Sequence, residues 1–245
     1  MSTTQLSTRS ARTNRSLSET KPPLRVAALR LCALGLVSGY VDALGYLELK
    51  GVYTGAMTGN STQFGTSLVM GAGHRTGLLA FVLAIFFAGG IAASLMKRRL
   101  RSLGDGWLIM GAILAIVQAL SLGLDAPHRV PYEVGLLAVA MAIQGETLSR
   151  FDGISIQTVV MTNNMLKCAS GIADWLAYAV GRLARRVASD RPEVAATVLP
   201  GMAWLTYVAG AAGAVVGARS ALLPFLWPVL LLVALAWDLR RNPAT

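Results

Sequence analysis

The sequence predicts an all-α fold: a polytopic membrane helix bundle with six full spans and two polar segments that are re-entrant or broken. Of its 245 residues, 54% are hydrophobic and only 14% are charged, whereas a soluble domain carries about a quarter charged residues. Apolar stretches close to the roughly 20 residues that cross a bilayer recur along the chain. Because too few polar residues remain for a water-facing surface, we expect lipid to be the solvent.

The basic residues lie between the apolar stretches. They give a formal net charge of +10, which in a soluble protein would suggest a nucleic-acid partner. Between apolar stretches, however, basic residues set membrane topology. We therefore expect the lipid bilayer, and no nucleic acid, among the partners of the chain.

The first 23 residues differ from the rest, since they are rich in Ser, Thr and Arg and contain one acid, Glu19. Such a segment cannot bury enough apolar surface to fold alone. It resembles an organellar transit peptide in composition, but it lacks regularly spaced large apolar residues. We expect residues 1–23 to be a disordered, basic cytoplasmic tail and residues 24–240 to be a single transmembrane domain.

Two of the apolar segments are too polar to face lipid. Segment 53–72 is rich in Thr, Ser, Gly, Asn and Gln, and segment 156–181 contains Lys167 and Asp174. Both are predicted to line the interior of the bundle. The eight segments are predicted at about 24–47, 53–72, 76–96, 106–124, 131–149, 156–181, 197–218 and 221–238.

Positive charge gathers in four clusters, and the positive-inside rule places such clusters in the cytoplasm. If all eight segments span, the tail and the cluster at 97–101 fall on opposite sides. If the two polar segments enter and leave on one side, six spans remain and both termini are cytoplasmic. The charges favour this second arrangement, although the two segments themselves are compatible with either. The clusters are the tail, 97–101, 182–186 and 240–241.

The six-span arrangement divides the chain into halves at about 26–124 and 131–238, in opposite orientations. Inverted repeats of this kind are common among secondary transporters. An internal likeness supports the repeat, because Met-Thr-Gly-Asn at 57–60 aligns with Met-Thr-Asn-Asn at 161–164, a shift of 104 residues. The same shift aligns Thr54 with Thr158, Asp42 with Glu146, and Leu44 with Leu148.

The motif Gly-Tyr-Val-Asp-Ala at 39–43, followed by Met-Thr-Gly-Asn at 57–60, resembles the YoaK family of bacterial membrane proteins, catalogued as a domain of unknown function. The resemblance covers most of residues 30–235 and is strongest in the first half. In the second half the family usually shows Gln-Asn-Ala and then Thr-Gly, whereas this chain has Gln-Gly-Glu at 144–146 and Thr-Asn at 162–163. The resemblance implies a multi-pass protein of the bacterial inner membrane, without implying a reaction.

Two acids are candidates for carrying protons or forming ion pairs. Asp42 lies late in the first apolar helix, and Glu146 is its partner in the repeat. An ionisable side chain inside a span is costly and is usually functional or paired. The alternatives are that Asp42 braces a loop near the membrane surface, and that Glu146 forms an interfacial pair with Arg150.

The two Met-Thr-x-Asn motifs are candidates for binding a substrate. A half-helix that starts there would point free N–H groups and a positive dipole end into the membrane interior. Hydroxyl and amide side chains would add donors and acceptors for a small polar or anionic solute. The alternative is helix packing by small polar residues. The candidate residues are Thr58, Gly59, Asn60, Thr162, Asn163 and Asn164.

Lys167 and Asp174 are seven residues apart and therefore share one helix face. They are expected to pair with each other, or with Asp42 and Glu146 across the repeat interface. Lys167 is alternatively a counter-charge for an anionic substrate.

The sequence predicts no catalytic residue, metal site or cofactor. Its two cysteines, Cys32 and Cys168, lie far apart inside apolar segments, with no spacing typical of a metal site or disulfide framework. No phosphate loop or nucleophile elbow occurs.

Among functions, a transporter of a small solute or small anion, with protons as a coupling ion, combines the inverted halves, the polar breaks and the acids. The alternatives are a channel, a membrane enzyme acting on a lipid-linked substrate with Asp42 and Glu146 as acid and base, and a structural or sensory subunit. A homodimer is compatible with the many small residues.

Overall fold

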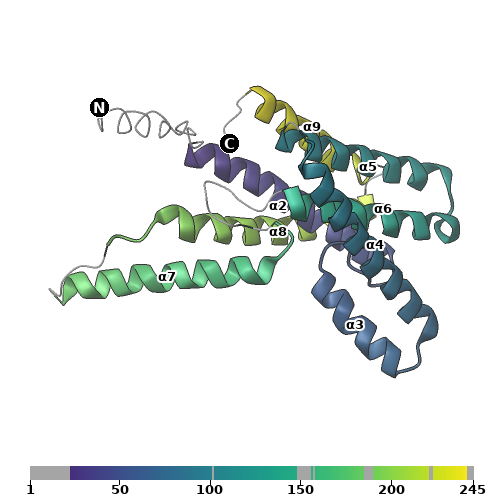
Figure 1. Ribbon diagram of the computed structural model, residues 1–245, viewed down its shortest axis with the longest axis horizontal. Helices are drawn as coiled ribbons and strands as arrows, with labels where there is room; N and C mark the ends of the chain where they lie inside the picture. Colours follow the sequence, from purple (N-terminus) through teal and green to yellow (C-terminus); the bar gives the residue numbers. More distant parts are fainter. Residues whose placement is uncertain are drawn as a thin grey trace, which may run out of the picture.

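The computed structural model describes residues 23–100, 102–147, 156, 158–184, 190–220 and 223–241, and every regular element within them is an α-helix (Figure 1). The all-α prediction is thus confirmed for this part of the chain. Of the predicted tail, only Pro23 is among the described residues. The helices are α2 (Leu24–Glu48), α3 (Met57–Val69), α4 (Gly73–Lys97), α5 (Leu103–Gly123), α6 (Ala126–Thr147), α7 (Met161–Leu183), α8 (Val194–Ser220) and α9 (Leu226–Arg241).

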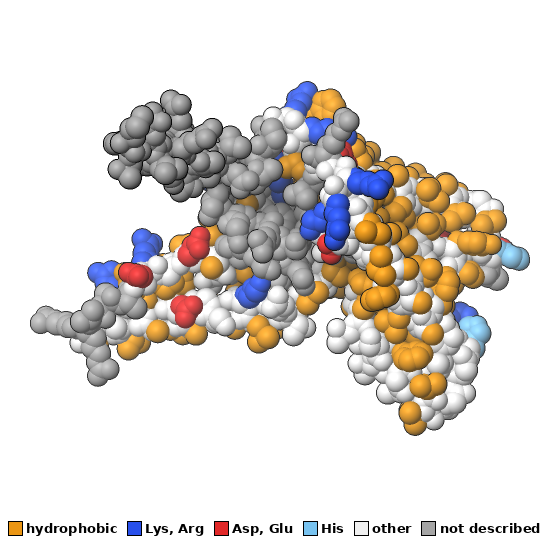
Figure 2. Space-filling model, viewed as in Figure 1, with side chains coloured by type: hydrophobic (Ala, Val, Ile, Leu, Met, Phe, Trp, Pro, Cys, Tyr) orange, Lys and Arg blue, Asp and Glu red, His pale blue; other side chains and the backbone are white. Residues whose placement is uncertain are grey.

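Four of these helices contain stretches long and apolar enough to cross a membrane. Hydrophobic side chains cover much of the outer surface, as expected for a protein that faces lipid (Figure 2). α2 differs from the others, because 61% of its most apolar stretch is buried, against 22% for α4. α2 is therefore the central helix of the bundle. The four stretches are Leu24–Glu48, Gly73–Lys97, Gly104–Gly123 and Val194–Arg219.

Glycines let α2 and α8 pack backbone against backbone. A Cβ atom placed on Gly39 would lie 1.9 Å from the carbonyl oxygen of Tyr207, and one on Gly210 would lie 2.1 Å from the carbonyl oxygen of Leu36. Small residues permit this close approach between membrane helices. The contact matters for the site because it brings Tyr207 against the middle of α2.

α4 packs against α6 in a comparable way, with Gly89 at the contact. A Cβ atom there would lie 3.2 Å from the Cβ of Ala142, so this crossing is less tight. α5 packs against α9 and α6. The shorter α3 folds back along α4, and α7 runs beside α8, so that these two hairpins project in different directions (Figure 1).

The chain reverses direction after α2 in a tight turn. Lys50 and Gly51 both have positive φ angles, 56° and 80°, in the left-handed region that ordinary residues rarely adopt. Arg75, at the start of α4, donates hydrogen bonds to the carbonyl oxygens of Lys50 (2.9 Å) and Gly51 (3.4 Å). The turn directs residues 52–56 back along α2, and α3 then begins beside Asp42.

Candidate functional site

Asp42 holds the chain segment that leads into α3. Its side chain is buried, and its Oδ1 accepts hydrogen bonds from the N–H groups of Thr54 (2.8 Å), Gly55 (2.8 Å) and Ala56 (3.4 Å). Its Oδ2 accepts a 2.6 Å hydrogen bond from the hydroxyl of Tyr207. These donors compensate the carboxylate for its burial. The contacts favour the bracing interpretation of Asp42, and its role in carrying protons stays a prediction.

Asn60 fixes the same segment from the first turn of α3. Its Oδ1 accepts a hydrogen bond from the N–H of Tyr53 (3.0 Å), and its Nδ2 donates to the Tyr53 carbonyl oxygen (2.7 Å). Asn60 is fully buried in these contacts. It therefore fixes the non-helical segment between α2 and α3, which is the first helix break. Gly59 beside it allows a close approach of the Tyr53 ring, which would lie 3.1 Å from an added Cβ atom.

The second helix break, the non-helical segment before α7, is held by Gln144 on α6. Gln144, which is fully buried, donates hydrogen bonds to the hydroxyl of Thr158 (3.0 Å) and to the carbonyl oxygen of Leu34 (3.1 Å). Thr158 is the repeat partner of Thr54, so Gln144 contacts at the second break the counterpart of a residue that Asp42 contacts at the first. Glu146, two residues further along α6, lies on another face of that helix.

Glu146 instead pairs with Lys97, the last residue of α4. Its Oε1 lies 3.7 Å from the Lys97 Nζ, which also donates a 2.8 Å hydrogen bond to the Glu146 carbonyl oxygen. Both side chains are about two-fifths exposed, at 39% and 40%. From the sequence, Lys97 was predicted only to belong to a basic cluster that sets topology. Its position at the end of α4, where a cation suits the helix dipole, was the available signal. Arg150, the alternative partner of Glu146, lies outside the described residues.

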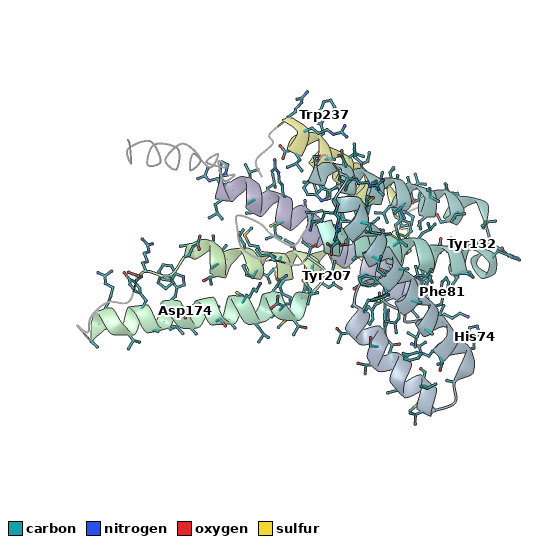
Figure 3. All side chains as sticks on the ribbon, viewed as in Figure 1. His74, Phe81, Tyr132, Asp174, Tyr207 and Trp237 are labelled. Atoms are coloured by element: carbon teal, nitrogen blue, oxygen red, sulfur yellow. The ribbon has the colours of Figure 1, made fainter. Side chains whose placement is uncertain are left out.

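A cavity of about 390 Å³ lies between the starts of α3 and α7. It is lined by residues 55–58 and 159–162, which contain the Met-Thr pairs of both motifs. Glu146 and Tyr207 also line it, the latter on α8 beside the start of α7 (Figure 3). The structure therefore brings together two segments that are about 100 residues apart in the sequence.

The starts of α3 and α7 both border this cavity, and at α3 the N–H groups of Met57 and Gly59 donate to the carbonyl oxygens of Gly55 (2.8 Å) and Ala56 (3.0 Å). Neither Ala56, before α3, nor Val160, before α7, makes a side-chain cap within the described part of the chain. The first turn of a helix has backbone N–H groups without intrahelical partners, and its dipole is positive at this end. Among the described residues, no group of three or more His, Cys, Asp or Glu side chains is placed to hold a metal ion.

The remaining predicted residues lie at different distances from the cavity. Thr58 and Thr162 line it, and both are exposed. Asn164 is buried in the first turn of α7, and Asn163 beside it is half-buried. Lys167 and Asp174 lie further along α7, with Asp174 exposed toward its far end (Figure 3).

Comparison with known proteins gives a family for the chain. The family model described as a protein of unknown function, DUF1275, matches residues 30–237. This region contains both helix breaks and all the candidate residues. It agrees with the expected unknown-function family, while the YoaK name stays a prediction. No curated protein and no solved structure matches the chain.

Proposed function

We propose that this chain, which belongs to the DUF1275 family of proteins of unknown function, is a proton-coupled transporter of small anions. The observation that carries the proposal is the cavity between the starts of α3 and α7. Two helix N-termini face one space of about 390 Å³, large enough for a small anion with some of its water. Thr58 and Thr162 add hydroxyl donors from the two sides.

The directions of the helices support a six-span arrangement. α2 and α6 are antiparallel, because Leu34 contacts Gln144 while Glu48 lies near Arg129. α4 and α6 are parallel, with Gly89 near Ala142 and Lys97 bonded to Glu146. α4 is therefore antiparallel to α2, so the chain between them enters and leaves on one side.

The same reasoning applies to the second half. α8 runs parallel to α2, since Gly35 contacts Ala203 and Tyr40 contacts Gly217. α6 is antiparallel to α2, so the chain from the end of α6 to the start of α8 also returns to the side that it left. With α3 and α7 both re-entrant, all four basic clusters fall on one side, as the positive-inside rule requires. This supports a bacterial inner-membrane protein with both termini in the cytoplasm.

The packing also supports an inverted repeat of two halves. The first helix of each half packs against the third helix of the other, α2 against α8 and α6 against α4. In each half a polar second helix lies beside the third, α3 along α4 and α7 along α8. Two-fold symmetry of this kind places a substrate site where the halves meet, which is the position of the cavity.

Glu146 is the coupling residue in this proposal, and Lys97 is its partner. While Glu146 is ionised, its carboxylate engages the Lys97 ammonium at 3.7 Å. Because Glu146 lines the cavity, a proton on it removes a negative charge that would repel an anion there. Binding of a proton and binding of an anion thus favour one another, which is the thermodynamic requirement for coupling.

A variant that fills the cavity tests the proposal. Gly90 lines the cavity, and a Cβ atom there meets no atom within 4 Å. Gly90→Val should therefore fold normally and lose transport. Gly77→Val is the matched control, because Gly77 lies on the same helix, away from the cavity, and also has no atom within 4 Å of an added Cβ.

The measurement is uptake of radiolabelled sulfate, formate and acetate into proteoliposomes, driven by an inward proton gradient. Wild-type protein and Gly77→Val should accumulate at least one of these anions above protein-free vesicles, and Gly90→Val should not. Equal uptake by Gly90→Val and Gly77→Val would mean that transport does not use the cavity. No uptake of any of the three anions by the wild type would reject the anion-transport proposal.

A further inference from the structure

A second group of charged side chains lies at the opposite end of α6 from Glu146. Arg129, near the start of α6, lies between two carboxylates: its Nε is 3.7 Å from Oε2 of Glu133, and its Nη2 is 3.8 Å from Oε2 of Glu48 on α2. Arg129 also donates a 3.2 Å hydrogen bond to the carbonyl oxygen of Ser121, at the end of α5. The group thus joins three helices.

The group is buried and incompletely satisfied. The Glu133 side chain is only 2% exposed, and those of Arg129 and Glu48 are 22% and 27% exposed. Oε1 of Glu133 and Nε of Arg129 are both buried and have no hydrogen-bond partner among the described residues. A buried carboxylate oxygen without a donor is costly. Burial of this unpartnered oxygen is less costly for a neutral carboxylic acid than for a carboxylate.

The charge count points to a proton. Two carboxylates face one guanidinium, so the group carries one negative charge when both acids are ionised. Nearby cations are engaged elsewhere or exposed: Arg75 bonds the turn after α2, and the Lys50 side chain is exposed.

The other titratable groups at this end do not relieve the imbalance. Tyr40 donates its hydroxyl to the carbonyl oxygen of Pro224. Asp125 and His128 form an exposed pair with each other at the start of α6.

We propose that Glu48, Arg129 and Glu133 form a proton-binding site, in which the two carboxylates share one proton and Glu133 holds it most of the time. Two interacting acids beside one cation ionise in two separate steps, and burial favours keeping the second proton. The loose distances of 3.7 and 3.8 Å fit this assignment, because Arg129 makes no hydrogen bond to either carboxylate. Glu133 and Glu146 are 13 residues apart on α6, which is about 20 Å at 1.5 Å per residue. The site is therefore separate from the cavity and does not depend on the transport proposal.

Carbodiimide labelling of the full chain in lipid nanodiscs tests the site. Dicyclohexylcarbodiimide partitions into apolar surroundings and consumes the proton of a carboxylic acid when it reacts. Peptide mass spectrometry would give the yield at each acid over a series of pH values. At neutral pH, Glu133 should react at least about tenfold more than the exposed Glu193, because a tenfold higher proton affinity gives about a tenfold larger protonated fraction.

Two variants distinguish a proton shared by Glu48 and Glu133 from a proton that Glu133 holds only because it is buried. Glu48→Gln leaves one carboxylate facing Arg129, so Glu133 should ionise and its labelling at neutral pH should fall to the level of Glu193. Arg129→Lys keeps the charge count and should leave the yield at Glu133 close to that of the wild type. Glu193→Gln, at an exposed acid just before α8, is the control and should leave it unchanged.

Either of two results would overturn the proposal. One is a yield at Glu133 equal to that at Glu193 in the wild type at neutral pH. The other is undiminished labelling of Glu133 in Glu48→Gln, which would mean that the two acids do not share the proton. The first result comes from the wild type, and the second from a variant that keeps the shape of the site, which gel filtration shows to be folded before labelling.

Discussion

The two helix breaks carry out the same structural task with different chemistry. At the first break, a carboxylate, Asp42, binds the segment around Thr54 through three N–H groups and receives the hydroxyl of Tyr207. At the second, a neutral amide, Gln144, binds Thr158 and reaches back to α2. Gln144 thus holds the second break, and the nearby acid Glu146 lines the cavity. One half therefore uses its acid to brace the break, and the other places its acid at the cavity, paired with Lys97.

The energetic difference between the breaks follows from charge. Hydrogen bonds to an ionised acceptor are roughly twice as strong as those between neutral groups. Asp42 accepts from three backbone N–H groups and from the hydroxyls of Thr54 and Tyr207, whereas the Gln144 side chain donates two neutral bonds. The first break should thus be the more rigid of the two, and the second the one that can rearrange.

Removing Asp42 should have the largest effect on folding. Asp42→Ala leaves the N–H groups of Thr54 and Gly55 and the hydroxyl of Tyr207 without their acceptor, which should cost about 3 kcal/mol or more. Glu146→Ala, its counterpart in the repeat, removes only a partly exposed pair and should cost about 0–1 kcal/mol. Thermal unfolding of the two variants in detergent measures the contrast. Equal melting temperatures would mean that Asp42 does not brace the break.

The two helix crossings that contain glycine should also differ in stability: a methyl group should destabilise the α2–α8 crossing more than the α4–α6 crossing. Gly210→Ala places a methyl group 2.1 Å from the Leu36 carbonyl oxygen and must push α8 from α2, at a cost of about 1–3 kcal/mol. Gly89→Ala meets Ala142 at 3.2 Å, which a small shift relieves, so it should cost less. Gly213→Ala is the control on α8, because its new methyl group would lie 3.9 Å from the Tyr40 ring. Similar losses of stability from all three would argue against a tight crossing at Gly210.

Much of the fold was predictable because membrane helices follow from length and hydropathy. The polar composition of the two breaks also identified the segments that meet at the cavity, since Thr58 and Thr162 both line it. The sequence also contains a pattern that favours the close α2–α8 crossing. Gly35 and Gly39 are four residues apart on one face of α2, a spacing typical of tight contacts between membrane helices.

The partners of the acids could not be predicted from the repeat. A shift of 104 residues aligned Asp42 with Glu146, but a difference of two residues turns a helical side chain by more than half a turn. Gln144 therefore faces Thr158 and Leu34, whereas Glu146 lies on another face of α6 and lines the cavity. Asp42 was equally ambiguous, because its donor Tyr207 is 165 residues away in the sequence. Contacts between such distant helices depend on packing that no local pattern contains.

Replacing Gln144 should have a smaller effect than replacing Asp42. Gln144→Leu keeps most of the volume but removes the donor to Thr158 and Leu34, and the loss of these neutral hydrogen bonds should cost about 1–2 kcal/mol. Thermal unfolding in the same detergent gives the comparison with Asp42→Ala. A greater loss from Gln144→Leu would reverse the proposed order of rigidity between the two breaks.

The smallest effect on stability, and the largest on coupling, should come from Glu146→Gln. The pair with Lys97 is two-fifths exposed and adds little to folding, so the melting temperature should stay close to that of the wild type. The amide cannot bind and release a proton, however, so a proton gradient should no longer drive accumulation of the anion, while exchange of the anion across the membrane should continue at a measurable rate. Uptake and counterflow in proteoliposomes separate these two activities, with Glu193→Gln as the control at an exposed acid. If Glu146→Gln still accumulates the anion and Asp42→Asn does not, the roles of the two acids are the reverse of those proposed, and the brace at the first break is also the proton carrier.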